Sequence, residues 1–271
     1  EAVYQWSNVD VRELKNYWVP GNEQIKQLSP TSADNPYFLA YGINNGFNRD
    51  RIYGNLKLDY QITPELTAFA RVSHDMFVED RETKIPWSYS RVRNGGYYLQ
   101  GIGRKETNAD FLLTYKKNIK TIDVSVSGGG NYMVQNYKED YMGGSILTVP
   151  GLYRVSNIPL ASLQVSNGSN QKAIYSLYGM ASLGYKNMLY LDLTARNDWS
   201  STLPAENRSY FYPSASLSWL ANYTFSLPKS VSLLKFRAGW AQVGNDASPY
   251  QLVPTLGTGT WGSLITTGVP G

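Results

Sequence analysis

Eight charged residues are the positions of this chain whose types and spacing could do chemistry, because each alternates with apolar neighbours. They are Lys57, Asp59, Arg71, Asp123, Asp192, Arg196, Lys235 and Arg237. Successive side chains of a β-strand point to opposite faces, so this spacing predicts that the eight share a wet face. Ionised groups away from water are costly unless they are paired. We therefore expect most of them to form ion pairs and hydrated contacts.

A second group of candidates is aromatic and lies in two regions rich in polar residues or glycine. These are Trp87, Tyr89, Tyr97, Tyr98 and Trp261. Aromatic rings stack on sugar faces and give broad contact with peptides or with a protein lid. The alternative for the first four is packing within a loop and anchoring at a membrane interface. Trp261 lies in a Gly-rich tail, where it is either a mobile contact or a packed anchor.

Enzymatic and metal sites are not supported by the reactive residues. The chain has one histidine, His74, and no cysteine, so it has no His-based triad, thiolate metal site or disulfide. Asp198 and Asp246 follow asparagine and fit turns. The pairs Glu79-Asp80 and Glu139-Asp140 could bind calcium in a loop, but neither completes an oxygen-ligand pattern. We therefore predict no catalytic residues, no cofactor and no metal site.

Composition limits the class of protein further. The chain has 271 residues, 42% of them hydrophobic, a net charge of +4 and a mean hydropathy of −0.36. No run of eighteen apolar residues is present, so a transmembrane helix is excluded. Lysine and arginine are scattered, so no nucleic-acid partner is predicted. The 22 tyrosines and seven tryptophans suit the interfacial girdles of a membrane β-barrel, which hides its apolar residues by alternation.

The segment 188–220 shows the elements that must position these residues. Leu189, Leu191 and Leu193 alternate with polar residues, and Ala215, Leu217 and Trp219 do the same after a polar loop. The same period of two predicts further strands. They run over about 51–62, 66–77, 109–117, 121–134, 173–185 and 233–243, with a short helical turn near 9–17. The fold class is therefore all-β and antiparallel.

Connection lengths and aromatic ends favour a membrane barrel. Long loops are expected at about 78–108, 135–171 and 198–210, and they alternate strictly with tight turns, as extracellular loops alternate with periplasmic turns. Tyr60, Tyr115, Tyr185 and Trp219 fall at the short-turn ends, and Trp199, Tyr210, Phe211 and Trp240 fall toward the other ends. About eight strands cannot close a wide barrel, so they would form either an arc of a larger one or a complete small one.

Three segments resemble the SusC/RagA family of TonB-linked outer-membrane transporters. NDWSSTLPAENRSYFYPSASLSWL, at 197–220, is similar to the barrel signature of that family. FRAGWAQVGNDASPYQL, at 236–252, resembles its next strand and loop, and NPYFLAYGINNGFNRDRIYGNLKLDY, at 35–60, resembles the stretch into an earlier strand.

The resemblance implies a TonB-dependent transporter of the bacterial outer membrane, spanning the lipid bilayer. It implies that the expected strands form an arc of a larger barrel of about 22 strands with a plugged lumen. In such proteins a SusD-like surface lipoprotein captures an oligosaccharide or peptide, and TonB displaces the plug. It also implies that the eight charged residues face the lumen or the plug. Residues 1–48 and 244–271 are expected to be extracellular loops, with barrel strands and loops over 49–243. We expect the chain to be a piece of a longer polypeptide, without plug or N-terminal domains.

Two other interpretations remain open. The first is a soluble all-β glycan-binding or adhesin module, whose apolar strand faces would meet in one core. The second is a complete eight-stranded barrel, because barrels of that size close around side chains alone.

Overall fold

The computed structural model describes residues 9–29, 33–225, 228 and 230–252, and the backbone of 257–261 and 264–268. The strands are β1 (Asn44–Gln61), β2 (Leu66–Tyr89), β3 (Val92–Ile119), β4 (Ile122–Gly144), β5 (Gln164–Tyr185), β6 (Leu189–Ser200), β7 (Ser209–Leu220), β8 (Lys235–Ala241), β9 (Gly257–Trp261) and β10 (Leu264–Gly268). The helical segments are single turns. They are η2 (Val11–Lys15), η3 (Phe38–Gly42), η4 (Val155–Asn157), η5 (Leu160–Ser162) and η6 (Ala221–Tyr223).

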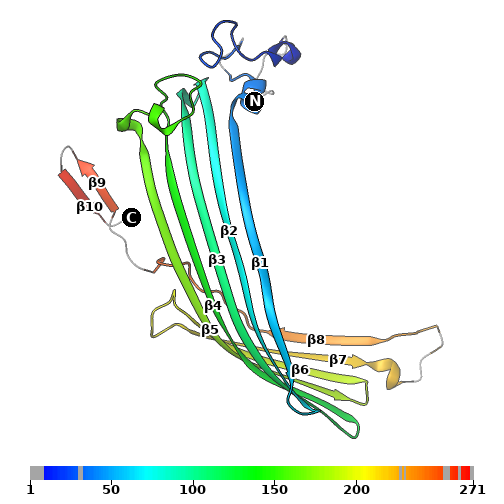
Figure 1. Cartoon of the computed structure of the whole chain (residues 1–271). Helices are drawn as coiled ribbons and strands as arrows, with labels where there is room; N and C mark the ends of the chain where they lie inside the picture. The colour runs from blue at the N-terminus through cyan, green and yellow to red at the C-terminus, as the bar shows by residue number, and fades with distance from the viewer. Residues whose placement is uncertain are drawn as a thin grey trace. The chain divides into compact units, whose positions relative to one another are not determined.

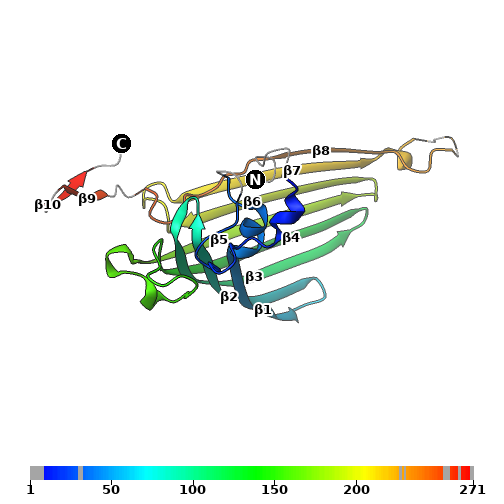
Figure 2. The ribbon, with the colours of Figure 1, turned by 90° about the horizontal axis from the view of Figure 1, so that it is seen from above.

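Strands β1 to β8 form one sheet in which each strand pairs with its neighbours in the chain (Figures 1 and 2). The pairs β5–β6, β6–β7 and β7–β8 are antiparallel, and β1 and β8 are the two ends of the strand order. Strands β9 and β10 form a separate antiparallel pair. The predicted all-β sheet of about eight antiparallel strands is confirmed.

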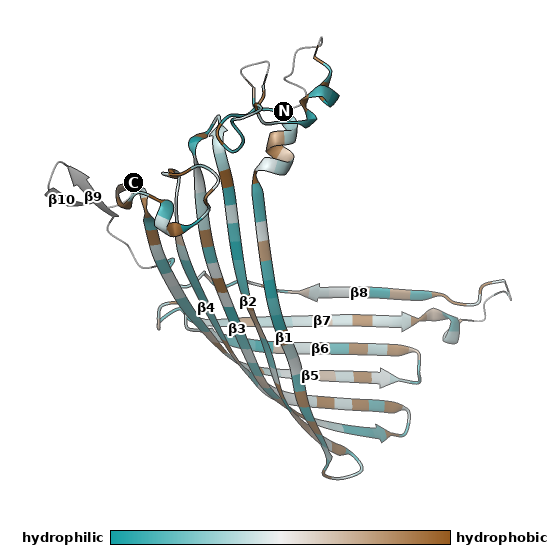
Figure 3. Cartoon of the chain, turned by 45° about the horizontal axis from the view of Figure 1, so that its top comes forward, coloured by the Kyte–Doolittle hydropathy of each residue, from teal (hydrophilic) through white to brown (hydrophobic). Residues whose placement is uncertain are grey.

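The register explains why alternation in the sequence produces two different faces. Leu191 lies opposite Leu217, and the next pair is Asp192 opposite Ser216. Directly opposite residues of antiparallel strands share a face, so apolar side chains meet apolar ones and polar side chains meet polar ones. Figure 3 shows the resulting alternation of hydrophobic and hydrophilic bands along the strands. We call these the apolar face and the polar face of β5–β8.

The tight turns lie where the sequence predicts them. Residues 186–188 join β5 to β6, and Lys186 and Asn187 have φ angles of 50° and 53°, the left-handed pair of a type I′ turn. Between β1 and β2, the N–H of Leu66 donates to the Thr63 hydroxyl at 3.0 Å. The helical turn expected near 9–17 is present as η2.

The prediction of a long loop at 78–108 is wrong. Strand β2 continues to Tyr89 and β3 begins at Val92, so a two-residue turn joins them. The strict alternation of long and short connections therefore fails here. The loop expected at 135–171 is also too long, since β4 ends at Gly144 and β5 begins at Gln164.

The end of the β2–β3 hairpin, where a two-residue turn joins the strands, packs against the β4–β5 connection, and this explains why its pattern was missed. The chain divides into two compact units, and unit 1 comprises Glu1–Ile52, Met76–Lys105 and Tyr137–Ser169. Its buried cluster joins Tyr97 of β3 to Leu147 and Ile158 of the β4–β5 connection. Because strand residues here pack against loop residues, charged and aromatic side chains replace a simple apolar alternation.

Unit 2 comprises Tyr53–Asp75, Glu106–Asn136 and Asn170–Gly271. It contains the whole of the paired strands β6, β7 and β8 and the tight turns after β1, β3 and β5. The eight charged residues predicted from the sequence to share a wet face all lie in unit 2.

Candidate functional site

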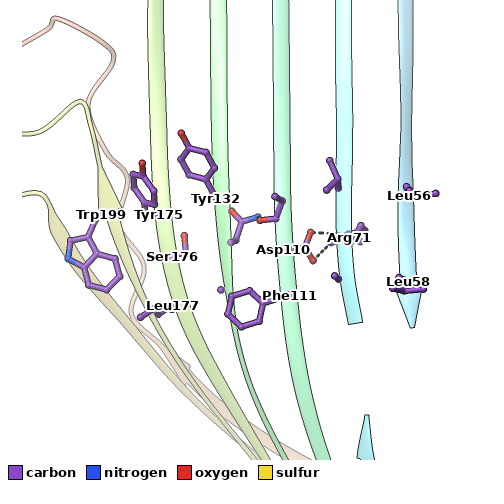
Figure 4. Close-up of a pocket in the computed structure, with 15 residues that line it drawn as sticks. Leu56, Leu58, Arg71, Asp110, Phe111, Tyr132, Tyr175, Ser176, Leu177 and Trp199 are labelled. Atoms are coloured by element: carbon purple, nitrogen blue, oxygen red, sulfur yellow. Dashed lines mark hydrogen bonds and ion pairs between the residues drawn. The ribbon is translucent and has the colours of Figure 1, made fainter. Parts of the chain in front are cut away.

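A two-point ion pair of unit 2 joins β2 to β3. The Arg71 guanidinium donates to both carboxylate oxygens of Asp110, with Nε–Oδ2 at 3.0 Å and Nη2–Oδ1 at 3.2 Å (Figure 4). The Asp110 side chain is only 6% exposed, whereas that of Arg71 is 46% exposed. A two-point pair of this kind fixes the orientation of both groups.

The pair extends toward β1 through an aromatic ring. Lys57 lies with Nζ 4.7 Å from the centre of the Phe69 ring, and Arg71 lies with Cζ 6.0 Å from the same ring. Lys57 also pairs with Asp59, with Nζ–Oδ1 at 2.6 Å. Cations over an aromatic face are attracted by its quadrupole, so Phe69 links the two basic groups.

The pair is followed on the other side by Tyr178 of β5. Its hydroxyl donates to the carbonyl of Phe111 on β3 at 3.4 Å, and so reaches past β4. A Cβ placed on Gly129 of β4 would lie 2.2 Å from that same oxygen. Only glycine therefore fits at this point of β4.

Arg196 of β6 completes the series. Its Cζ lies 5.8 Å from the centre of the Tyr178 ring, its Nε donates to Asp198 at 2.6 Å, and its Nη2 donates to Ser176 at 2.8 Å. We call the whole set the polar row. It consists of Lys57, Asp59, Phe69, Arg71, Asp110, Tyr178, Arg196 and Asp198.

The other four predicted charged residues lie outside the polar row. Asp123 accepts from the Asn118 amide at 2.6 Å, and Asp192 accepts from the Ser182 hydroxyl at 2.6 Å. Lys235 and Arg237 are exposed on β8, where Arg237 lies opposite Ser218. The structure thus joins Lys57, Asp59, Arg71 and Arg196 in the polar row and leaves the other four outside it. Contact of any of the eight with a ligand or plug stays a prediction.

Unit 1 contains a second polar network, which sequence reasoning missed. Glu79 of β2 is 1% exposed and forms ion pairs with Arg49 and Arg81. Arg81 donates to Gln100 at 3.3 Å, and Gln100 donates to Glu139 at 2.6 Å. Tyr137 also donates to Glu139, at 2.8 Å.

This network bears on the calcium interpretation of Glu79-Asp80 and Glu139-Asp140. Glu79 and Glu139 are committed to cationic or hydrogen-bond donors of the protein. Across the ranges that the structure describes, no group of three His, Cys, Asp or Glu side chains is placed to hold a metal ion.

The aromatic candidates lie on strands, which corrects their predicted place in a loop. Trp87 and Tyr89 end β2, and Tyr97 and Tyr98 lie near the start of β3. Trp87 donates to the carbonyl of Leu147 at 3.2 Å. Trp261 is the last residue of β9, and its side chain lies outside the described residues.

Two of these aromatic residues have strongly fixed positions. The Tyr97 hydroxyl donates to Glu82 at 2.8 Å. The Tyr98 ring stacks with Tyr141, with centroids 6.2 Å apart and planes at 28°.

Another tyrosine of unit 1, Tyr153, lies in the β4–β5 connection. Burial and the charge of nearby Tyr17 raise the pKa of Tyr153 to about 12, so its phenol is neutral. A ligand or lid role for the aromatic candidates stays a prediction.

The apolar face carries an aromatic row near each end. Tyr132 stacks on Tyr175 with centroids 4.6 Å apart, and Tyr175 lies opposite Trp199. Toward the short turns, Trp219 and Phe236 pack with centroids 5.7 Å apart. Tyr185 lies ten residues after Tyr175, which is about 33 Å along β5. At a tilt near 45° this gives a height of about 23 Å, close to the roughly 25 Å of the apolar band of a membrane barrel.

A shallow hollow of about 740 Å³ lies on the apolar side of unit 2. Figure 4 shows Tyr132, Tyr175, Phe111 and Leu177 along it, with the Arg71–Asp110 pair between Phe111 and Leu58. Its lining is mostly hydrocarbon, so it offers few polar groups to orient a soluble ligand.

No helix in the described ranges combines the length and the apolar character needed to cross a membrane.

Comparison with known proteins gives relatives that are all much longer than this chain. No family model matches it. TonB-dependent receptor P3 of Formosa agariphila is 29% identical over 260 residues, which are 88% of this chain and 24% of that protein. The RagAB peptide transporter structure matches with a TM-score of 0.71 at 18% identity, over 91% of this chain and 29% of the other. The RagAB peptide importer in the closed-closed state gives 0.68 at 19% identity, over 92% and 29%.

This chain is similar to part of a SusC/RagA-type TonB-dependent transporter barrel. The sequence resemblance is therefore confirmed, and the fold matches that of a transporter barrel segment. The predicted outer-membrane localisation is supported by the same matches. The chain spans about a quarter of the curated relative, and the matched proteins are named as a receptor and as transporters.

Proposed function

We propose that this chain forms part of the barrel of an outer-membrane transporter that imports oligosaccharides or peptides. In this proposal TonB supplies the energy and a SusD-like lipoprotein captures the substrate at the surface. The observation that carries it is the two-faced sheet of β5–β8, whose apolar face bears aromatic rows about one hydrocarbon thickness apart.

In the transporter, the chain contributes a barrier and a lining instead of bond chemistry. The strand ladders satisfy the backbone groups that lipid cannot, and the apolar face is in contact with acyl chains. The polar row lines the lumen, where its paired charges remain hydrated and contact the plug. Residues 1–48 and 244–271 lie on the extracellular side, together with Trp87, Tyr89, Tyr97, Tyr98 and Trp261 as contacts for ligand or lid.

The RagAB proteins transport peptides, which favours a peptide substrate. The half-buried aromatic side chains Trp87, Tyr89 and Tyr98 would suit sugars as well. The soluble glycan-binding or adhesin module has less support. It requires the apolar faces to meet in one core, yet Leu177, Leu193 and Leu217 are 58%, 42% and 44% exposed.

The test uses the full-length protein extracted from native membranes with detergent. The unboiled sample should run as a compact band of the mass of a complete transporter, shift on boiling, and carry a surface lipoprotein. A species near 30 kDa that stays in the aqueous fraction without a heat shift would refute the barrel and favour the soluble module.

A further inference from the structure

The segment after β8, residues 242–252, folds back over the polar face of its own sheet, and we call it the strap. It leaves the sheet at Gln242, whose N–H donates to the carbonyl of Pro213 at 3.0 Å. A Cβ on Gly244 would lie 3.2 Å from Cε1 of Tyr212. Tyr212 lies opposite Arg196, so the strap crosses β7 on the polar face.

Asp246 fastens the strap to strands that are not adjacent to β8. Its Oδ1 lies 2.6 Å from Nζ of Lys172 on β5, and its Oδ2 accepts from the Ser200 hydroxyl on β6 at 2.7 Å. The Asp246 side chain is 12% exposed, that of Lys172 is 18% exposed, and Ser200 is 3% exposed. Strand β7 lies between β6 and β8 in the sheet, so these contacts require the strap to cross it.

The geometry also explains where the strap begins. The β7–β8 register ends at Ser214 opposite Ala241. Pro213 has no N–H, so it accepts from Gln242 but cannot return the second hydrogen bond of that pair. The ladder therefore stops at Pro213, and the chain is free to turn inward.

From these contacts we propose that the strap is a latched inner gate, held on the polar face by Asp246 through Lys172 and Ser200. Closed, it narrows the path along that face, and release of the carboxylate lets it swing away. The proposal rests on the proposed function in one respect, that the polar face lines the lumen. The contacts themselves do not depend on it.

The test measures access to a cysteine on the polar face of β7, four residues beyond Tyr212, where the strap crosses. The chain has no cysteine, so Ser216→Cys, on the exposed polar side of β7, gives a single reporter in this part of the full-length protein. It is labelled on whole cells with a small maleimide and with a polyethylene-glycol maleimide. In the Asp246→Asn background we expect the rate with the large reagent to rise about tenfold, because the hydrogen-bonded charge pair is lost. The rate with the small reagent should change much less.

Three further variants make the result decisive. Ser200→Ala should give a smaller rise than Asp246→Asn, and Asp246→Glu should restore most of the protection. Glu206→Gln removes an exposed carboxylate of the β6–β7 loop and should change neither rate. Each variant is first shown to keep the heat-shifting band, so that a misfolded barrel is not scored as an open gate.

An unchanged ratio of the two rates in Asp246→Asn would overturn the gate, whatever the protein imports. If the reporter reacts with neither reagent in any variant, the polar face is closed to the outside and the gate is equally refuted. Because no substrate enters this assay, failure of the gate is separable from failure of the proposed transport function.

Discussion

The strand pair β6–β7 and the hairpin end of β2–β3 are both long antiparallel pairs, but their two faces are built differently. In β6–β7, Leu191 and Leu217 share one face, and Asp192 and Ser216 share the other. In the hairpin end, Glu79 pairs with Arg49 and Arg81, while Glu82 of opposite parity bonds Lys84 and Tyr97. The comparison teaches that apolar and polar residues alternate clearly along a strand only where one face of the sheet meets an apolar medium. Where both faces meet protein or water, charge appears on both.

The largest effect is expected from placing a charge on the apolar face of β7. Leu217→Lys should destabilise the barrel by about 2–4 kcal/mol, since a lysine near the bilayer centre loses its hydration. Its neighbour Ser216→Lys lies on the polar face and should stay within about 0.5 kcal/mol. The readout is the urea concentration at which the unboiled band unfolds.

The hairpin end supplies the contrasting measurement. Val78→Lys in β2 replaces a half-exposed side chain of unit 1 and should behave like Ser216→Lys. Equal losses for Leu217→Lys and Val78→Lys would remove the distinction between the two regions.

The second effect concerns packing within unit 1. Gly143 of β4 lies against Tyr98, and a Cβ there would be 2.5 Å from Cδ1 of Tyr98 and 2.6 Å from the carbonyl of Tyr97. Gly143→Val should therefore cost about 1–3 kcal/mol by overpacking. Gly128→Val is the control, because nothing lies within 4 Å of its Cβ position. The measurement is urea unfolding of both variants. Equal stability of Gly143→Val and Gly128→Val would contradict this account.

The third effect is the pH response of the strap. Burial raises the pKa of Asp246, but the hydrogen bonds from Lys172 and Ser200 outweigh it, and the pKa lies below its ordinary value of 3.8. The ring of Tyr212 also lies against the strap, beside Gly244. A lowered carboxylate pKa contributes stability above the ordinary value that is lost as pH falls through the lowered one. Hydrogen exchange of strap amides, corrected for intrinsic rates, should stay slow from pH 8 to 5 and accelerate only below about 3.8.

A faster exchange already at pH 6 would show that another group controls the strap. Asp246→Asn supplies the reference, because its strap should exchange fast at every pH.

The smallest effect is expected at the exposed end of the polar row. The side chains of Lys57 and Asp59 are 43% and 66% exposed, so Asp59→Asn should cost only about 0.2–1 kcal/mol. Asp110→Asn should cost more, because it leaves the Arg71 guanidinium facing a buried amide. Urea unfolding that ranks the two in the opposite order would show that burial does not determine the strength of this row.

The fold could be predicted from the sequence where the physical pattern is local. The period of two over 188–220 and the turn at Lys186-Asn187 correctly locate β6, β7 and the turn that precedes them. The hairpin end of β2–β3 could not be predicted in the same way. Its strands are stabilised by partners distant in sequence, such as Leu147 against Trp87, which leave no periodic signal.

The candidate site was predicted in part, for a similar reason. Alternation selected Arg71, and counting in twos along the expected strand 109–117 would also have selected its partner Asp110. Asp246 was interpreted as a turn residue, because its partner Lys172 is 74 residues away. No spacing rule links two such positions, and only the path of the strap brings them together.

The point where the β7–β8 ladder ends, at Pro213 and Gln242, separates two regions that tolerate insertions differently. Within the paired parts of β7 and β8, each insertion would shift a register and move side chains from the apolar face to the polar face. In the strap, residues 242–252, the contacts with the sheet are those of Gln242, of Gly244 with Tyr212, and of Asp246 with Lys172 and Ser200. New segments could therefore be added after Gln242 without shifting a strand register, and under the proposed function they would change what passes through the barrel.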